Sequence, residues 1–144
     1  MDAKALIAKF EGLSLKAYRD SGGVYTIGYG STINPITGIP IKAGDEITKD
    51  TAVQWLRIQA AKTETEVRKK VKVPLNTNQI AALTSLAYNI GIGAFSRSTL
   101  LKLVNQGAKP NDIAAHFIDW NKVKGKEVPG LTRRRQEEAA LYLS

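Results

Sequence analysis

The sequence predicts an α+β protein in which a small N-terminal lobe with a β-hairpin is joined by a long helix to a larger helical lobe. Two observations carry this prediction. Short β-type stretches and turn residues gather before Thr48, whereas nearly all of the chain after it has helical spacing. The length of 144 residues, with 43% hydrophobic and 24% charged residues, fits a single globular domain over residues 1–144.

The first lobe is expected over about residues 12–50, after an N-terminal helix. That helix is predicted over residues 2–11, because its apolar residues follow helical spacing between the N-cap Asp2 and the stop residue Gly12. The stretches KAYRD and VYTIGY, separated by SGG, then predict a hairpin with a three-residue turn. STINPITGIPIKAGD is rich in Gly and Pro and predicts a loop, with one short edge strand over residues 39–42.

A connecting helix is predicted over about residues 49–71. Thr48 suits its N-cap, and its apolar stripe is narrow while charged residues are frequent. Helices of this kind often bridge two lobes. Pro74, with Val73 before it, ends the helix.

The second lobe is expected to contain about residues 73–144 together with the N-terminal helix. TNQIAALTSLAYNI, over residues 77–90, is apolar nearly all round and predicts the central buried helix, which the glycines of GIG then break. Three further helices are predicted, from the cap Ser98 to Gly107, from near Pro110 through Trp120, and, after the basic loop NKVKGKEVPG, from about Thr132 to Leu143.

The net charge of +8 favours polyanionic partners such as nucleic acid, anionic membrane surfaces or bacterial envelope polymers. No helix pattern has a basic recognition face, so we expect no nucleic acid partner. No apolar run approaches the roughly 18 residues of a membrane span, so we expect no stable membrane insertion. Because the chain has no cysteine and one histidine, thiolate and histidine metal sites are excluded, and we expect no metal and no cofactor.

The opening stretch FEGLSLKAYRDSGGVYTIGYGS carries the candidate chemistry. Glu11 lies in the last turn of the first helix, where the helix dipole and partial burial both favour a protonated carboxyl group, as a general acid requires. The hairpin register places Asp20 and Thr26 on one face, and Gly28 and Gly30 would keep that face free of bulk. An acid with a second carboxylate matches glycosidic bond cleavage. The alternative is that Glu11 pairs with an arginine and Asp20 only starts the turn.

FEGLSLKAYRDSGGVYTIGYGST resembles the phage lysozymes of glycoside hydrolase family 24, whose signature is Glu, eight residues, Asp or Cys, five residues, Thr. Glu11, Asp20 and Thr26 match it, and the resemblance continues through AYNIGIGAFSRSTLLKLVN and GLTRRRQEEAALYL. It implies a lysozyme-like fold and cleavage of the β-1,4 bond between N-acetylmuramic acid and N-acetylglucosamine in peptidoglycan. Glu11 would be the general acid, Asp20 the stabiliser, base or nucleophile, and Thr26 the residue that positions water. Ser31 departs from the family, because many members have histidine there.

The resemblance also implies a bacteriolytic endolysin that lyses the host cell at the end of infection, acts on peptidoglycan glycan strands and works as a monomer. MDAKALIAKFEG does not match a secretory signal, so we expect the chain in the host cytoplasm until a holin releases it; a trimmed N-terminal anchor segment is the alternative. Two rival functions stay open. A lytic transglycosylase acts on the same bond with a lone Glu, and a basic wall- or nucleic-acid-binding module would lack catalysis.

The three arginines Arg133–Arg135 open the last predicted helix, where positive charge is unfavourable. We therefore expect compensation, either by an anionic partner or by Glu11 and other acids of the first lobe. The alternative is surface pairing with Glu137 or Glu138 at helical spacing.

A few other side chains have both a functional and a packing interpretation. Tyr88 and Ser98 resemble cleft-lining positions of the family, although core packing and helix capping explain them equally well. His116 is expected as an ordinary surface or packing residue. Trp55 and Trp120 are expected as core anchors rather than sugar platforms.

Overall fold

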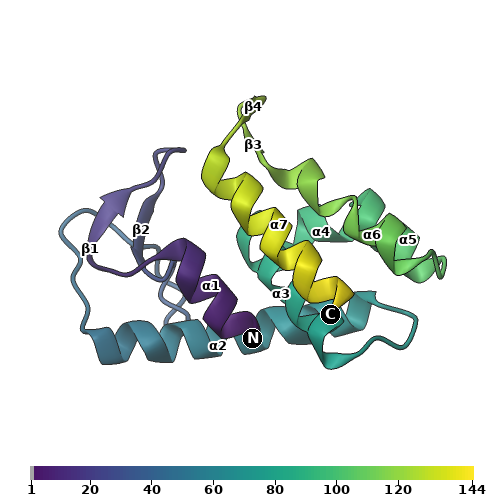
Figure 1. The fold of residues 1–144 in the computed structure, drawn as a ribbon. Coiled ribbons are helices and arrows are strands. Elements are labelled where there is room, and N and C mark those ends of the chain that lie inside the picture. Colours follow the sequence, from purple (N-terminus) through teal and green to yellow (C-terminus); the bar gives the residue numbers. More distant parts are fainter. Residues whose placement is uncertain (1) are drawn as a thin grey trace.

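The computed structural model describes residues 2–144 and has the predicted α+β architecture (Figure 1). A small hairpin lies on one side of the molecule and most of the helices lie on the other. The long helix α2 runs beneath both parts (Figure 1). The lobe boundaries at residues 12–50 and 73–144 remain a prediction. No helix in residues 2–144 is at once long enough and apolar enough to cross a bilayer.

Helix α1 covers Ala3–Glu11, as predicted. The Asp2 side chain accepts a hydrogen bond of 2.8 Å from the Ala5 N–H and so caps the first turn. The chain then leaves the helix at Gly12, whose φ of 69° favours glycine. Glu11 is therefore the final residue of the helix.

Strands β1 (Ser14–Arg19) and β2 (Tyr25–Gly28) form the predicted antiparallel hairpin. Tyr18 pairs with Thr26, the register that the three-residue turn requires. The predicted edge strand over residues 39–42 is wrong, because Pro40 makes only an isolated bridge to Ile33. The bridge has its two flanking hydrogen bonds, from Asn34 N–H to the Ile39 carbonyl and from Ile41 N–H to the Thr32 carbonyl, but the Asn34 carbonyl accepts from Gly38 in a turn and the ladder goes no further.

Helix α2 covers Lys49–Lys70, close to the predicted bounds, and Thr48 caps it by accepting from the Thr51 N–H. Its buried side chains belong to three apolar clusters. Trp55 packs with the hairpin side, Leu56 with α1, and Val67 with the helical core. One helix thus contributes to the core of both parts of the molecule, as the bridging interpretation requires.

Helix α3 (Thr77–Ile90) is the central buried helix, and all residues from 80 to 87 are buried. Three shorter elements pack around it: α4 (Ile92–Ser96), α5 (Thr99–Asn105) and α6 (Pro110–Ala114). The break after α3 is narrower than predicted, because Gly91 alone interrupts the helices and Gly93 lies within α4.

The C-terminal segment differs most from the prediction. The helix expected through Trp120 is divided into α6 and the 3₁₀ helix η1 (Phe117–Trp120). The basic loop contains a second hairpin, β3 (Lys122–Val123) with β4 (Lys126–Glu127). Helix α7 covers Pro129–Leu143 and begins earlier than Thr132, because proline suits the first turn of a helix.

Candidate active site

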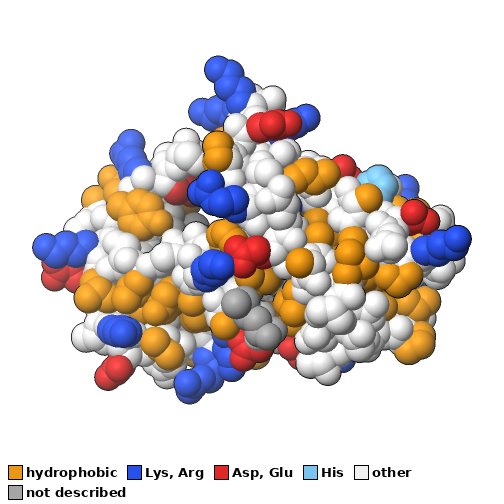
Figure 2. Space-filling view, in the orientation of Figure 1, with side chains coloured by type: hydrophobic (Ala, Val, Ile, Leu, Met, Phe, Trp, Pro, Cys, Tyr) orange, Lys and Arg blue, Asp and Glu red, His pale blue; other side chains and the backbone are white. Residues whose placement is uncertain are grey.

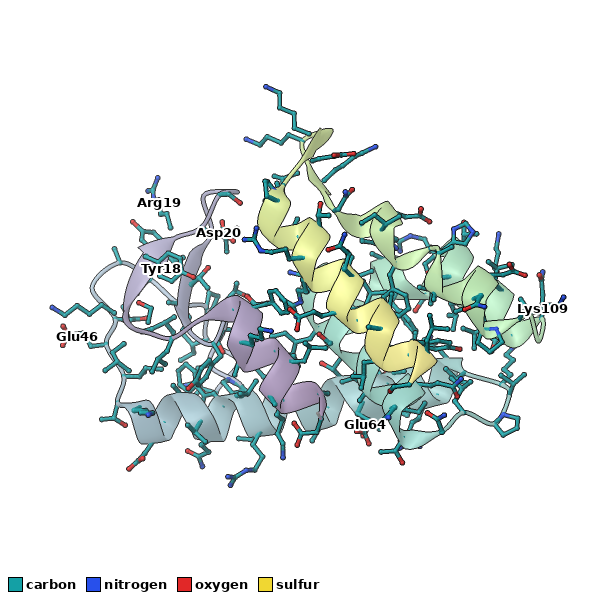
Figure 3. The ribbon with its side chains drawn as sticks, viewed as in Figure 1. Tyr18, Arg19, Asp20, Glu46, Glu64 and Lys109 are labelled. Atoms are coloured by element: carbon teal, nitrogen blue, oxygen red, sulfur yellow. The ribbon has the colours of Figure 1, made fainter. Side chains whose placement is uncertain are left out.

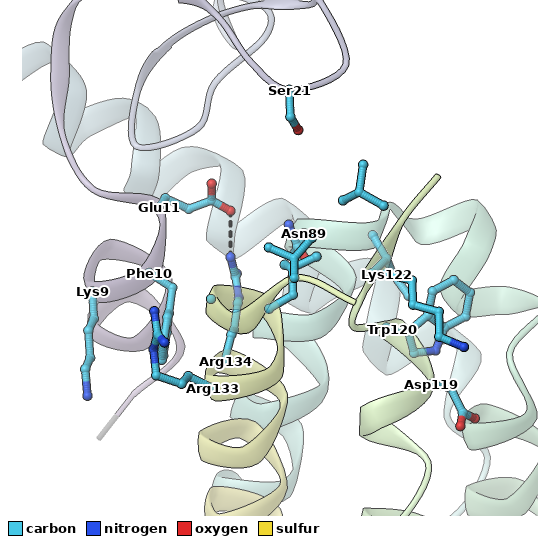
Figure 4. A pocket seen from close by; sticks show the side chains of 15 residues that line it. Lys9, Phe10, Glu11, Ser21, Asn89, Asp119, Trp120, Lys122, Arg133 and Arg134 are labelled. Carbon is cyan, nitrogen blue, oxygen red and sulfur yellow. Dashed lines mark hydrogen bonds and ion pairs between the residues drawn. The ribbon is translucent and has the colours of Figure 1, made fainter. Parts of the chain in front are cut away.

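A cavity of about 340 Å³ lies between the hairpin and α3. All three predicted catalytic side chains line it: Glu11 from the end of α1, Asp20 from the hairpin turn and Thr26 from β2. Figure 3 shows Asp20 at the end of the hairpin that faces α7. A larger cavity of about 1070 Å³, seen in Figure 4, adjoins Glu11 on the side of α7 and the second hairpin. The structure thus brings the three predicted residues to one opening.

Glu11 has a side chain that is 20% exposed and makes an ion pair with Arg134 of α7. Arg134 Nη1 donates to Glu11 Oε2 at 2.8 Å, the dashed contact of Figure 4. This pair is the compensation that the sequence predicts for the arginine run.

The other carboxylate oxygen of Glu11 lies against Gly30. A Cβ atom added at Gly30 would come within 2.6 Å of Glu11 Oε1, and the φ of 83° also favours glycine. Gly30 therefore makes room for the carboxyl group itself. Gly28 does not clear the cleft as predicted, because its added Cβ would meet Ile47 at 3.3 Å and Ala52 at 3.6 Å.

Asp20 is exposed, and its Oδ1 accepts hydrogen bonds of 2.9 Å from the Gly22 and Val24 N–H groups. Both interpretations from the sequence therefore hold in part, since Asp20 organises the turn and also lines the cleft. In residues 2–144 its Oδ2 makes no hydrogen bond, which leaves one carboxylate oxygen available. Thr26 is 5% exposed, and its hydroxyl donates to the Val24 carbonyl at 3.0 Å.

Ser31 stands where many family members have histidine, so a contact made by that histidine is absent here. Ser31 takes part in a polar network instead. Its hydroxyl donates to Gln59 Oε1 at 2.7 Å, which connects the end of the hairpin to α2. The Tyr88 hydroxyl donates to the Tyr29 carbonyl at 2.9 Å and lies 3.3 Å from the same Gln59 oxygen. Burial, and then the negative charge of Glu11, raise the pKa of Tyr88. Tyr88 therefore stays protonated in the cleft at neutral pH.

The structure separates the remaining predictions. Ser98 is buried and caps α5 by accepting from the Leu101 N–H, so capping, not the cleft, explains it. His116 contacts Asp119 at 2.8 Å near the surface and lines neither cavity beside Glu11. Trp55 is 5% exposed in the hairpin-side core.

Two residues near Glu11 have a role that the sequence analysis did not assign. Trp120 packs against the helical core, as predicted, but it also lines the larger cavity. Asn89 lines both cavities, and its Oδ1 accepts a bond of 2.6 Å from Arg135. Asn89 lies within the stretch AYNIGIGAFSRSTLLKLVN that resembles the family, but its residue type alone does not mark it as a cleft residue.

The arginines of α7 do not pair at the surface. Arg134 and Arg135 are 2% and 0% exposed, and both contact the buried Glu138. Only Arg133 is exposed, beside the larger cavity. Figure 2 shows a group of basic side chains at the projecting β3–β4 hairpin, which carries Lys122, Lys124 and Lys126.

Comparisons with known proteins agree on one family. The family model described as phage lysozyme matches residues 8–138. The chain is 43% identical over 143 residues to the endolysin of Acyrthosiphon pisum secondary endosymbiont phage 1, covering 96% of this chain and 93% of that protein. It is 40% identical to the endolysin of Bacillus phage PZA over 96% of this chain, which spans about half (52%) of that relative. The solved endolysin from Escherichia coli O157:H7 phage FAHEc1 superposes with a TM-score of 0.85 at 44% identity, covering 99% and 90% of the two chains.

Proposed function

Because the chain belongs to the phage lysozyme family and is a peptidoglycan-hydrolysing enzyme, we propose that Glu11, Asp20 and Thr26 carry out its reaction. One observation supports this assignment above the others. The three side chains come from a helix end, a turn and a strand, yet they line a single cavity of about 340 Å³. Hydrolysis of a glycosidic bond is typically carried out by such a pair of an acid and a second carboxylate.

Glu11 is the general acid of the proposal. It protonates the oxygen of the β-1,4 bond between N-acetylmuramic acid and N-acetylglucosamine, so that the leaving sugar departs as an alcohol. Arg134 engages Oε2, and we assign the transferred proton to Oε1, on the Gly30 side of the cleft. The arginine thus holds the carboxyl group without occupying both of its oxygens.

Asp20 and Thr26 act on the sugar from the hairpin. The free oxygen of Asp20 stabilises the oxocarbenium-like centre or activates the attacking group. The Thr26 hydroxyl already donates to Val24, so its oxygen can accept a hydrogen bond and orient a water molecule. These two residues favour hydrolysis over the transglycosylase reaction, which needs no water. Reducing ends, rather than 1,6-anhydro ends, on the digested peptidoglycan would distinguish the two reactions.

The cell wall is the site of action, since peptidoglycan is the substrate of the family. A monomeric state, accumulation in the host cytoplasm and release by a holin remain predictions. Gel filtration tests the first, and fractionation of infected cells tests the other two.

Substitution of Glu11 by Gln tests the assignment of the acid. We expect Glu11→Gln to reduce the rate of peptidoglycan release by about 10³-fold or more, because Gln has the same shape but no transferable proton. The matched control is Glu137→Gln, since Glu137 is a half-exposed carboxylate paired with Lys9 outside the cleft. A folded Glu11→Gln variant that clears bacterial cells at the parent rate would remove Glu11 from the mechanism.

A further inference from the structure

Helix α7 contains buried charged groups that the proposed reaction does not use. Arg134, Arg135 and Glu138 are 2%, 0% and 0% exposed, although charged side chains are rarely buried without partners. Removing such groups from water is costly, and a hydrophobic replacement is often no less stable. Their presence directly behind Glu11 therefore calls for an explanation beyond stability.

Arg134 is held on three sides. Its Nη1 donates to Glu11 Oε2 at 2.8 Å, its Nε donates to Glu138 Oε2 at 3.2 Å, and its Nη2 donates to the Ser85 carbonyl at 3.1 Å. The planar guanidinium cannot turn without breaking two of these bonds at once. These bonds therefore fix the direction in which Nη1 of Arg134 points toward Glu11.

Glu138 is itself fixed by α3. Ser85 is 0% exposed, and its hydroxyl donates to Glu138 Oε2 at 2.6 Å. On the other side Arg135 Nε lies 3.1 Å from Glu138 Oε1. Burial raises the pKa of Glu138, while Arg135, Arg134 and the Ser85 hydrogen bond act in the opposite direction. Burial likewise lowers the pKa of Arg135 to about 10.

We propose that Glu138 and Ser85 are positioning residues for the reaction, because they hold Arg134 so that it offers a single N–H to Glu11 and shares its charge with a second carboxylate. This inference rests on the proposed role of Glu11 as the acid. Without Glu138, only the Nη2 bond to the Ser85 carbonyl restrains the guanidinium, which can then turn to bind both oxygens of Glu11, the preferred geometry of an arginine–carboxylate pair. That geometry would occupy Oε1 and hold Glu11 in its charged form.

The electrostatic consequence depends on every group that faces Glu11. In the smaller cavity these are Tyr18 from β1, Asp20 from the hairpin turn and Tyr88 from α3, and Arg134 of α7 contacts Glu11 directly. The larger cavity adds Lys9 of α1, Asp119 of η1, Lys122 of β3 and Arg133 of α7, and the charge of Arg135 also acts on Glu11. Within residues 2–144, Arg134 is the cation that forms an ion pair with Glu11, so its sharing between two carboxylates changes how much positive charge Glu11 experiences. Without the Glu138 charge, the positive charge of Arg134 acts on Glu11 as its one remaining carboxylate partner, and a cation beside a carboxyl group stabilises the carboxylate.

The test compares Ser85→Ala and Glu138→Gln with the parent enzyme on purified peptidoglycan. Ser85→Ala should lower kcat about fivefold and leave KM unchanged, and Glu138→Gln should have a larger effect, about 50-fold. In both variants the alkaline limb of the kcat–pH profile should move to lower pH, by about half a unit in Ser85→Ala. Thr84→Val is the matched control, since Thr84 is a buried α3 residue whose hydroxyl bonds only to the Ile80 carbonyl, and it should keep both kcat and the limb.

The effect must also pass through Arg134. In an Arg134→Lys background, Ser85→Ala should cause no further loss of kcat, because lysine cannot bridge Glu11, Glu138 and Ser85 together. A full fivefold effect in that background overturns the inference. So does a Ser85→Ala variant that melts earlier but keeps the parent kcat and pH profile. Ser85→Ala decides the question alone if Glu138→Gln does not fold.

Failure of this inference is distinguishable from failure of the proposed function. If Glu11→Gln is inactive while Ser85→Ala behaves as the parent, only the positioning role is lost. If Glu11→Gln is as active as the parent, the acid itself is wrongly assigned, and no behaviour of Ser85→Ala restores it.

Discussion

The two carboxylates of the cleft are held in opposite ways. Glu11 ends a helix and is fixed from behind by a buried arginine, with 20% of its side chain exposed. Asp20 lies in an exposed turn, where backbone amides of Gly22 and Val24 hold one of its oxygens. The comparison shows how one fold gives two carboxylates different surroundings, which suit the different roles we propose for them. A proton donor needs a controlled local charge, whereas a carboxylate that faces water or a sugar carbon needs access.

Asp20→Asn removes the carboxylate on the hairpin side, and we expect a large loss of activity. Asn keeps an acceptor for both turn hydrogen bonds but loses the charge, so we expect about a 10³-fold loss of activity with an unchanged melting temperature. Peptidoglycan release and thermal unfolding measure the two quantities. Asp45→Asn is the control and should retain activity, since Asp45 is a partly exposed turn carboxylate of the same lobe that pairs with Lys42.

An Asp20→Asn variant with parent activity would mean that Asp20 serves the turn alone. Asp20→Ala then gives the complementary result. It removes the acceptor as well, so it should lower stability by about 1 kcal/mol in addition to the loss of activity.

Gly30→Ala tests the other carboxylate, Glu11, on the helical side of the cleft. Its Cβ would lie 2.6 Å from Glu11 Oε1, so the carboxyl group must move, and a displacement of this size costs about 10²-fold in rate. The strain at φ 83° also lowers stability. Gly38→Ala separates these effects, because Gly38 has φ 75° with open space around it. It should lose stability and keep kcat, and equal rates for the two variants would contradict the steric argument.

Ser31→Ala should have the smallest effect on activity. Ser31 is 2% exposed and bonds to Gln59, away from both carboxylates. Losing this bond should cost about 1 kcal/mol in the free energy of unfolding and change kcat by less than about twofold. Urea unfolding and peptidoglycan release provide the measurements. A tenfold fall in kcat would show that the Ser31–Gln59–Tyr88 network reaches the reaction.

Much of the fold could be predicted because local patterns and tertiary packing agree. Asp2 and Gly12 mark the ends of α1, and the run of buried residues from 80 to 87 is apolar in the sequence itself except for Thr84 and Ser85. The second hairpin was missed because β3 and β4 contain two residues each, too few to show a period of two.

The sequence predicted three residues that line the cleft, but it did not identify the residues that hold Glu11 in place. Glu11, Asp20 and Thr26 lie within one short stretch, so the register of a hairpin places two of them together. Arg134 is distant in sequence and is one of three successive arginines, and only the packing of α7 on α3 selects it for Glu11. A run of charged residues usually predicts a solvent-exposed helix face, so the burial of Arg135 and Glu138 could not be predicted from the sequence.

The length of α1 sets the position of the proposed acid. Glu11 is its terminal residue, and Gly12 turns the chain away immediately afterwards. An additional residue inserted upstream would rotate the carboxyl group by about 100° around the helix axis and advance it by about 1.5 Å. The acid would then point along another flank of the helix, out of reach of its arginine. The number of residues between the cap at Asp2 and the stop at Gly12 therefore fixes the direction of the carboxyl group that we propose as the proton donor.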